Sequence, residues 1–197
     1  VKITEWPDKR KNPEGTIVEV IGDIEDTQTH IEAVLLSKKV RQVFPEDVIK
    51  EAKRVSEEVI HESELKRRKD LRDLPIITID GSDAKDLDDA VYAEKISDDE
   101  YKLSVHIADV THYVKEDRKI DKEALKRATS IYISDRVIPM LPKELSNGVC
   151  SLNPGEDKLT LSVEMIINKE GKVTDYTIFE SILNNRFRMT YDDVTEI

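Results

Sequence analysis

Five aspartates stand within ten residues of the sequence, and their type and spacing are suited to metal chemistry. The segment reads TIDGSDAKDLDD from position 78, and the five are Asp80, Asp83, Asp86, Asp88 and Asp89. Carboxylates this close repel one another unless a cation lies among them. Magnesium takes carboxylate, water and phosphate oxygens as ligands, and phosphodiester hydrolysis needs a cation on the phosphate oxygens and a positioned water. The cluster is therefore a candidate magnesium site.

The pattern around the cluster predicts how its carboxylates are positioned. A short apolar strand over residues 76–79 ends at Asp80. Asp86 and Asp88 flank an apolar residue, so an extended backbone places both carboxylates on one side. Asp89 opens the next expected strand. A loop that leaves and re-enters a sheet in this way brings its acids together.

Other interpretations of the cluster differ in spacing or in the residues they need. Surface acids and Asx-turns are common, so a lone run of aspartates is more often structural than catalytic. An EF-hand calcium loop beginning at Asp80 or Asp86 has no glycine at its sixth position and no glutamate at its twelfth. A glycine-rich phosphate loop is absent, and the four histidines lack the spacing of a zinc site.

Composition limits the class of protein. Lysine and arginine total 31 and aspartate and glutamate total 42, which gives a formal charge of −11. Taken alone, this acidity argues against nucleic-acid binding, which usually needs a basic surface. No apolar run approaches the roughly 20 residues that span a bilayer. Cys150 is the only cysteine, which excludes an intramolecular disulfide and fits a reducing, cytoplasmic compartment.

The first 75 residues predict a small β-structure followed by a helix. Strands are expected over residues 16–21 and 31–36, so that residues 1–44 form the C-terminal part of a small barrel. A linking helix is expected over residues 45–72, because apolar residues recur there at helical spacing. Its basic run, residues 66–69, is interpreted as a solvated helix face, with a phosphate contact as the alternative.

Residues 76–197 predict a mixed α/β domain. Two hairpins and two helices are expected after the first strand. The hairpins pair residues 90–96 with 101–110 and 159–168 with 173–183, and the helices cover residues 119–132 and a segment that Thr190 caps before Tyr191. The fold class is therefore α+β.

The sequence resembles a known family along nearly its whole length. The segment TIDGSDAKDLDDAVY opens the resemblance, and further motifs follow in the same order. They are SVHIADVTHYV (104–114), RATSIY (127–132), VIPMLP (137–142), LSNGVCSL (145–152) and RMTYDDV (188–194). Together they are similar to the catalytic RNB domain of the ribonuclease II / ribonuclease R family. Residues 6–20 resemble the last strands of that family's second cold-shock domain, an OB-fold.

The resemblance implies roles for individual residues. Asp80 and Asp89 match magnesium ligands, Asp86 supports the metal cluster, and Asp88 matches the residue most critical to cleavage. Asp88 would position the water or a second metal, and Asp83 matches no invariant ligand. Tyr132 matches an aromatic that stacks on a base near the RNA 3′ end, whereas an isolated tyrosine at a helix end would be interpreted as core.

The family activity is processive 3′→5′ hydrolysis of single-stranded RNA to 5′-mononucleotides with magnesium, for which manganese could substitute. We expect this activity for the parent protein and little or none for the chain alone, because later catalytic motifs of the family lie beyond Ile197. A non-catalytic module that binds single-stranded RNA is the alternative. The four-aspartate set favours the enzyme, because a pure binder gains nothing from negative charge beside phosphates.

Overall fold

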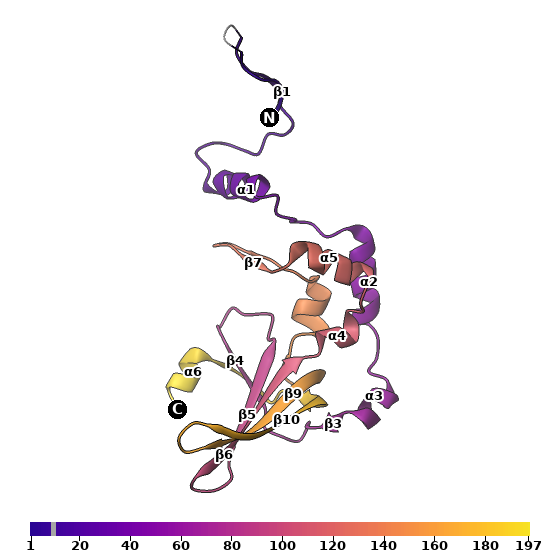
Figure 1. Ribbon diagram of the computed structural model, residues 1–197, viewed down its shortest axis with the longest axis vertical. Coiled ribbons are helices and arrows are strands. Elements are labelled where there is room, and N and C mark those ends of the chain that lie inside the picture. The colour runs from indigo at the N-terminus through magenta and orange to yellow at the C-terminus, as the bar shows by residue number, and fades with distance from the viewer. Residues whose placement is uncertain (9–10) are drawn as a thin grey trace. The chain divides into compact units, whose positions relative to one another are not determined.

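The computed structural model describes residues 1–8 and 11–197, which form two compact units, Val1–Gln42 and Val43–Ile197 (Figure 1). In the first unit, β1 (Lys2–Glu5) pairs antiparallel with β2 (Glu14–Thr16). Helix α1 (Thr27–Ser37) follows.

The two strands predicted for this first unit differ from the structure. Within residues 16–21 only Thr16 belongs to a strand, and residues 31–36 lie inside α1. The side chain of Asp26 accepts a hydrogen bond from the backbone N–H of Gln28 and so caps the start of the helix. A short apolar run fits a helix and a strand equally well by its periodicity, and the cap decides between them here.

A seven-stranded sheet forms the centre of the second unit (Figure 1). Its strand order is β11-β4-β5-β6-β9-β10-β3, with β11 parallel to β4, β3 parallel to β10 and the other pairs antiparallel. The strands are β3 (Lys69–Asp70), β4 (Ile77–Asp80), β5 (Asp89–Lys95), β6 (Glu100–Ala108), β9 (Asp157–Asn168), β10 (Val173–Asn184) and β11 (Phe187–Thr190). Both predicted hairpins are confirmed, as β5–β6 and β9–β10.

Helices and one small hairpin complete this unit. The helices are α2 (Glu46–Ser56), α3 (Glu62–Arg67), α4 (Val110–Tyr113), α5 (Lys119–Arg127) and α6 (Tyr191–Thr195), and a π-helical turn η1 covers Leu145–Val149. Strands β7 (Ile131–Tyr132) and β8 (Val137–Ile138) pair with each other. Thr190 caps α6 as predicted, with Asp193 reciprocating in a capping box.

Two predicted helices are too long. The single linking helix over residues 45–72 is wrong, because the helix is interrupted between α2 and α3 and the segment continues into β3. The helix over residues 119–132 ends at Arg127, because Ala128 adopts a left-handed φ of 65°.

The basic run over residues 66–69 is only partly a solvated face. Arg68 is buried, and its guanidinium donates to Asp109 Oδ2 at 2.6 Å and to Glu64 Oε2 at 2.9 Å. Removing one partner from a buried ion pair leaves an uncompensated charge. Arg68 therefore joins α3 to the chain that follows β6, and the phosphate contact considered for this run does not apply to it.

The apolar core of the second unit lies beneath the loop that carries the aspartates. Leu87 in that loop is 1% exposed and belongs to the same buried cluster as Leu145, Leu152 and Leu159. Within the described residues, no helix is long and apolar enough to cross a membrane. The expected domain boundaries, which divide the chain into residues 1–44, 45–75 and 76–197, stay a prediction.

Candidate metal centre

The loop between β4 and β5 holds the aspartate cluster. Asp80 is the last residue of β4 and Asp89 is the first of β5, as expected, so the two strands fix both ends of the loop. Between Asp86 and Asp88, the side chain of Leu87 points into the core. This burial holds the two flanking carboxylates at the surface side of the loop.

Ser151 fixes the backbone of the same loop. Its hydroxyl accepts a hydrogen bond from the N–H of Leu87 at 3.0 Å and lies 3.2 Å from the carbonyl of Lys85. The next residue, Leu152, donates its N–H to the carbonyl of Leu87 at 2.8 Å. Because Ser151 is fully buried, these bonds are shielded from water.

Arg188 on β11 fixes the first half of the loop. Its Nη2 lies within hydrogen-bond distance of three backbone carbonyls, those of Gly81 (3.2 Å), Ser82 (2.9 Å) and Ala84 (2.8 Å). Strand β11 runs parallel to β4, with Arg188 beside Thr78. The guanidinium charge also acts on the carboxylate of Asp80, whose pKa it lowers against the larger effect of burial.

Electrostatics show that four of the five carboxylates form one group. Partial desolvation, followed by the charges of Asp86, Asp89 and Asp80, raises the pKa of Asp88 to about 6 although its side chain remains open to solvent. Burial and then the charge of Asp89 raise the pKa of Asp80. Asp83 is not among the carboxylates that raise these pKa values. The interacting carboxylates are those of Asp80, Asp86, Asp88 and Asp89, the quartet that the family resemblance predicts.

The chemistry of the quartet fits a hard divalent cation. Oδ2 of Asp80 is buried and has no hydrogen-bond partner among the described residues. A buried carboxylate oxygen without a donor is costly unless another ligand satisfies it. Within residues 1–8 and 11–197, no three histidine, cysteine, aspartate or glutamate side chains already converge as a ligand set.

Tyr132 lies beside the quartet. It belongs to the β7–β8 hairpin, its side chain is 68% exposed, and its hydroxyl donates to Oδ2 of Asp86 at 3.2 Å. The interpretation of Tyr132 as a core residue at a helix end is therefore wrong. The structure brings its ring next to the aspartate loop, where it is free to contact another molecule.

The two histidines of the SVHIADVTHYV motif lie in the sheet and in α4. His106 is fully buried in β6, and its Nδ1 lies 2.7 Å from Oγ of Ser162. His112 is partly buried in α4. The full burial of His106 and its contact with Ser162 indicate a structural residue.

Sequence reasoning did not identify Ser151 or Arg188 as parts of the site. Both lie in quoted motifs, LSNGVCSL and RMTYDDV, but their contacts span 64 or more positions in the chain. Nothing in local spacing predicts which distant serine or arginine will meet the loop. The only signal for these two residues was that they lie in motifs that resemble those of the family as a whole.

Comparison with known proteins agrees with this fold. The RNB domain family matches residues 68–197, and the cold shock domain family matches residues 1–45. Ribonuclease R of Thermotoga maritima is 48% identical over 197 residues, which cover 99% of this chain and 28% of that protein. The chain therefore spans less than a third of that relative's length.

Solved structures share the same backbone arrangement. Mycoplasma genitalium RNase R in complex with ribose methylated single-stranded RNA superposes with a TM-score of 0.88 at 30% identity, over 98% of this chain and 30% of that one. Yeast Ssd1, a pseudonuclease, shares the fold with a TM-score of 0.72 at 22% identity, over 99% of this chain and 25% of that one. The chain belongs to the RNB domain family.

Proposed function

We propose that the whole protein carrying this chain is a magnesium-dependent exoribonuclease that hydrolyses single-stranded RNA processively from the 3′ end to 5′-mononucleotides. The observation that carries the proposal is the quartet of Asp80, Asp86, Asp88 and Asp89, in which one buried carboxylate oxygen has no donor. The reaction class is supported by relatives that are named ribonuclease R. The substrate is supported by a structural neighbour that is bound to single-stranded RNA.

The residues of the quartet would have different roles. Asp80 and Asp89 sit at the ends of two paired strands, so they are the more rigid pair and suit the holding of the cation. Magnesium, or manganese in its place, supplies positive charge to the phosphate oxygens of the scissile bond. Asp86 supports the cluster and also accepts the hydroxyl of Tyr132.

Asp88 is the group best placed to orient the attacking water. Without a cation, desolvation and then the neighbouring carboxylates raise its pKa to about 6, and a bound cation would offset those charges and favour the carboxylate. In the reaction its carboxylate would accept a hydrogen bond from the attacking water and orient it for in-line displacement. Tyr132 would stack on a base near the 3′ end, since its ring is exposed beside the loop.

The alternative function is a non-catalytic module that binds single-stranded RNA. Fold alone does not decide between the two, because the same fold occurs in a protein described as a pseudonuclease. The aspartate quartet favours the enzyme, since four carboxylates beside a phosphate backbone oppose binding unless a cation is present. We place the activity in the cytoplasm, because the single free thiol, Cys150, fits a reducing compartment.

The test is Asp88→Asn in the whole protein. The change keeps the side chain's volume and removes the charge that orients water, so cleavage of labelled oligoadenylate in magnesium should fall by about a hundred- to a thousandfold, as for loss of a key electrostatic group. RNA affinity, measured in a chelator by fluorescence anisotropy, should stay equal or rise, because a negative charge beside phosphate has been removed.

Asp83→Asn is the matched control, since it removes the same charge from the same loop outside the quartet. It should leave the cleavage rate nearly unchanged. If Asp88→Asn lowers RNA affinity as much as it lowers the rate, Asp88 positions RNA and the proposed role is wrong. Binding without cleavage in the wild-type protein would support the non-catalytic module.

A further inference from the structure

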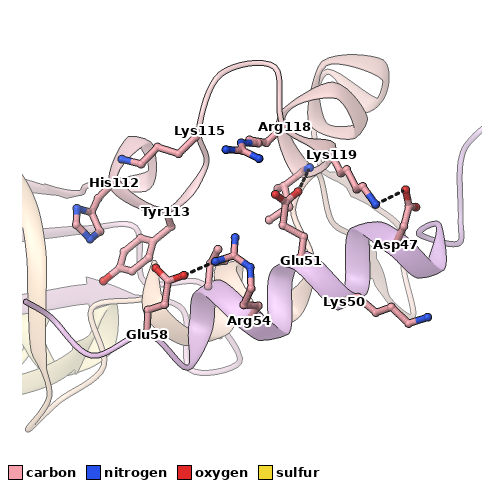
Figure 2. A pocket seen from close by; sticks show the side chains of 12 residues that line it. Asp47, Lys50, Glu51, Arg54, Glu58, His112, Tyr113, Lys115, Arg118 and Lys119 are labelled. Carbon is pink, nitrogen blue, oxygen red and sulfur yellow. Dashed lines mark hydrogen bonds and ion pairs between the residues drawn. The ribbon is translucent and has the colours of Figure 1, made fainter.

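A second concave site lies in the same unit, on different elements from the aspartate loop. It is a cavity of about 620 Å³ between α2 and the segment that contains α4 and the start of α5 (Figure 2). Cationic side chains outnumber carboxylates among its lining residues, five against three, without counting His112. In a chain with a net charge of −11, such a local excess of cations needs an explanation.

Each of the three carboxylates in the cavity already has a partner. Asp47 pairs with Lys119 at 3.3 Å, and Glu58 pairs with Arg54 at 2.5 Å. Glu51 accepts the backbone N–H of Ile120 at 3.0 Å, close to the start of α5 (Figure 2). Lys119 and Arg54 thus offset the charges of Asp47 and Glu58, whereas Glu51 is bound by a neutral N–H that leaves its charge in the cavity.

Of the three cations left, Lys50 pairs with Glu46 outside the lining at 2.6 Å, so Arg118 and Lys115 carry the remaining positive charge. Across residues 1–8 and 11–197, the guanidinium of Arg118 makes no hydrogen bond or ion pair, and the amine of Lys115 donates only to the carbonyl of Thr111 at 3.1 Å. Arg118 is also the N-cap residue of α5, where the helix dipole adds positive potential. Figure 2 shows the guanidinium groups of Arg118 and Arg54 on opposite sides of the open space.

The geometry points to a phosphate-binding site in this cavity, and we propose that Arg118 and Arg54 hold the phosphate, with Lys115 at its edge. Two guanidinium groups offer planar forks of donors that match phosphate oxygens. Arg54 can take part although it pairs with Glu58, because a guanidinium has five N–H donors. The phosphate belongs either to the backbone of an RNA strand or to a free nucleotide, and one experiment separates these sources.

The experiment measures phosphate binding by the intact 197-residue chain in a chelator, without divalent cations. Under these conditions its result does not depend on the aspartate quartet or on cleavage. The probes are a fluorescent oligouridylate, adenosine 5′-monophosphate and inorganic phosphate. The variants are Arg118→Ala, Arg118→Lys and Arg54→Ala. Lys126→Ala is the control, because it removes one exposed positive charge from the same helix outside the cavity.

We expect Arg118→Ala and Arg54→Ala to weaken binding about three- to tenfold at low salt, and Lys126→Ala to change it much less. Arg118→Ala and Arg54→Ala should each also reduce the dependence of the logarithm of the RNA association constant on the logarithm of salt concentration by about 0.7, the value for one lost contact on a single strand. Arg118→Lys should keep the salt dependence but lose part of the affinity, because it retains charge without the fork.

Comparison of the oligouridylate with the two small probes identifies the source of the phosphate. A loss with the oligouridylate alone assigns the cavity to the backbone of a bound strand. A loss with adenosine monophosphate or inorganic phosphate assigns it to a free nucleotide, and either result supports the site. The proposal is overturned if no probe binds the wild-type chain, or if Arg118→Ala and Arg54→Ala change binding no more than Lys126→Ala does.

Discussion

Burial gives chemically identical aspartates different properties. Asp80 is half-buried at a strand end and has an oxygen without a donor, whereas Asp88 stays open to solvent and has its pKa raised to about 6. The first arrangement suits a fixed ligand, because its position is set by the sheet. The second suits a group that exchanges a proton or orients water. The sequence pattern alone, DLDD, does not distinguish these roles.

Tyr132 offers a residue-scale test that separates its ring from its hydroxyl. Tyr132→Ala removes both, and Tyr132→Phe removes only the hydrogen bond to Asp86. A stacked base contributes roughly 1–3 kcal/mol, so Tyr132→Ala in the whole protein should lengthen the shortest product that remains at the end of digestion. Tyr132→Phe should leave product length unchanged. Gel analysis of products from one labelled oligomer gives both results.

A core role for Tyr132 would give a different outcome. In that case Tyr132→Ala would lower the melting temperature by several degrees and leave the products as they are. The exposed side chain predicts the reverse.

His106 predicts a pH dependence of stability that is unrelated to the aspartates. Burial lowers its pKa from 6.5 to about 4, so the unfolded chain binds a proton at a higher pH than the folded chain does. Its contribution is therefore fully present above about pH 6.5 and is lost progressively as the pH falls towards 4. The difference in pKa sets an upper limit of about 3 kcal/mol on this loss.

Urea unfolding at about pH 7 and about pH 5 measures the effect. His106→Asn should reduce the difference between the free energies of unfolding at the two pH values, whatever its effect on stability at a single pH. An equal difference in the wild-type chain and the variant would mean that His106 is protonated in the folded state.

At the scale of elements, strands β4, β5 and β11 position the loop together with the chain around Ser151. Arg188 contributes three contacts to backbone carbonyls, so Arg188→Ala should loosen residues 81–84 without removing any carboxylate. Hydrogen–deuterium exchange at the loop amides should rise, and the stabilisation given by manganese should fall. Loss of charge-assisted bonds of this kind costs about 1.5–3 kcal/mol.

Arg186→Ala is the comparison for Arg188→Ala. Arg186 precedes β11, and its guanidinium donates to one carbonyl, that of Arg72, away from the loop. The loop's exchange and the manganese effect should be unchanged in Arg186→Ala. Similar results for both variants would show that Arg188 has no particular role in holding the loop.

Local signals in the sequence were sufficient where one element borders a turn or cap. The strand ending at Asp80, the β9–β10 hairpin and the capped helix after Thr190 were all predicted in this way. Local signals failed where tertiary contacts determine the end of an element. Apolar residues recur at helical spacing within residues 45–72, yet α2 ends at Ser56, and α3 ends at Arg67, just before β3 pairs with β10.

The clustering of aspartates could be predicted from their closeness in sequence, whereas the residues that support the loop could not. Spacing alone places five aspartates in one loop, and the family resemblance selects Asp80, Asp86, Asp88 and Asp89 among them. Ser151 and Arg188 reach that loop from distant strands and turns, which no local pattern encodes. Tyr132 needed the family resemblance, because a lone tyrosine carries no signal of exposure.

At the scale of the whole molecule, the distribution of charge matters more than its total. The net charge of −11 coexists with an acidic loop that suits a cation and with a cavity whose cations exceed its carboxylates. Net charge governs solubility and long-range attraction, whereas a ligand responds to the local field. The acidity that argued against nucleic acid is therefore compatible with two local sites for phosphate chemistry.

The central claim is that Asp80, Asp86, Asp88 and Asp89 form one divalent-cation site, and cation-linked stability of the chain tests it most directly. A cation that binds only the folded state stabilises it by about 2.7 kcal/mol at one hundred times its dissociation constant. Millimolar manganese or magnesium should raise the melting temperature, and sodium at matched ionic strength should not. Asp80→Asn combined with Asp89→Asn should abolish the rise, while Asp83→Asn should retain it.

The stability of the chain without divalent cations gives a second test of the same claim. Without divalent cations, Asp88→Asn should stabilise the chain modestly, because it relieves repulsion from Asp86 and Asp89. A melting temperature that rises with manganese only when Asp80 and Asp89 are both present is the predicted outcome. A wild-type transition that does not move with manganese, or a shift that survives the double substitution, would contradict the account.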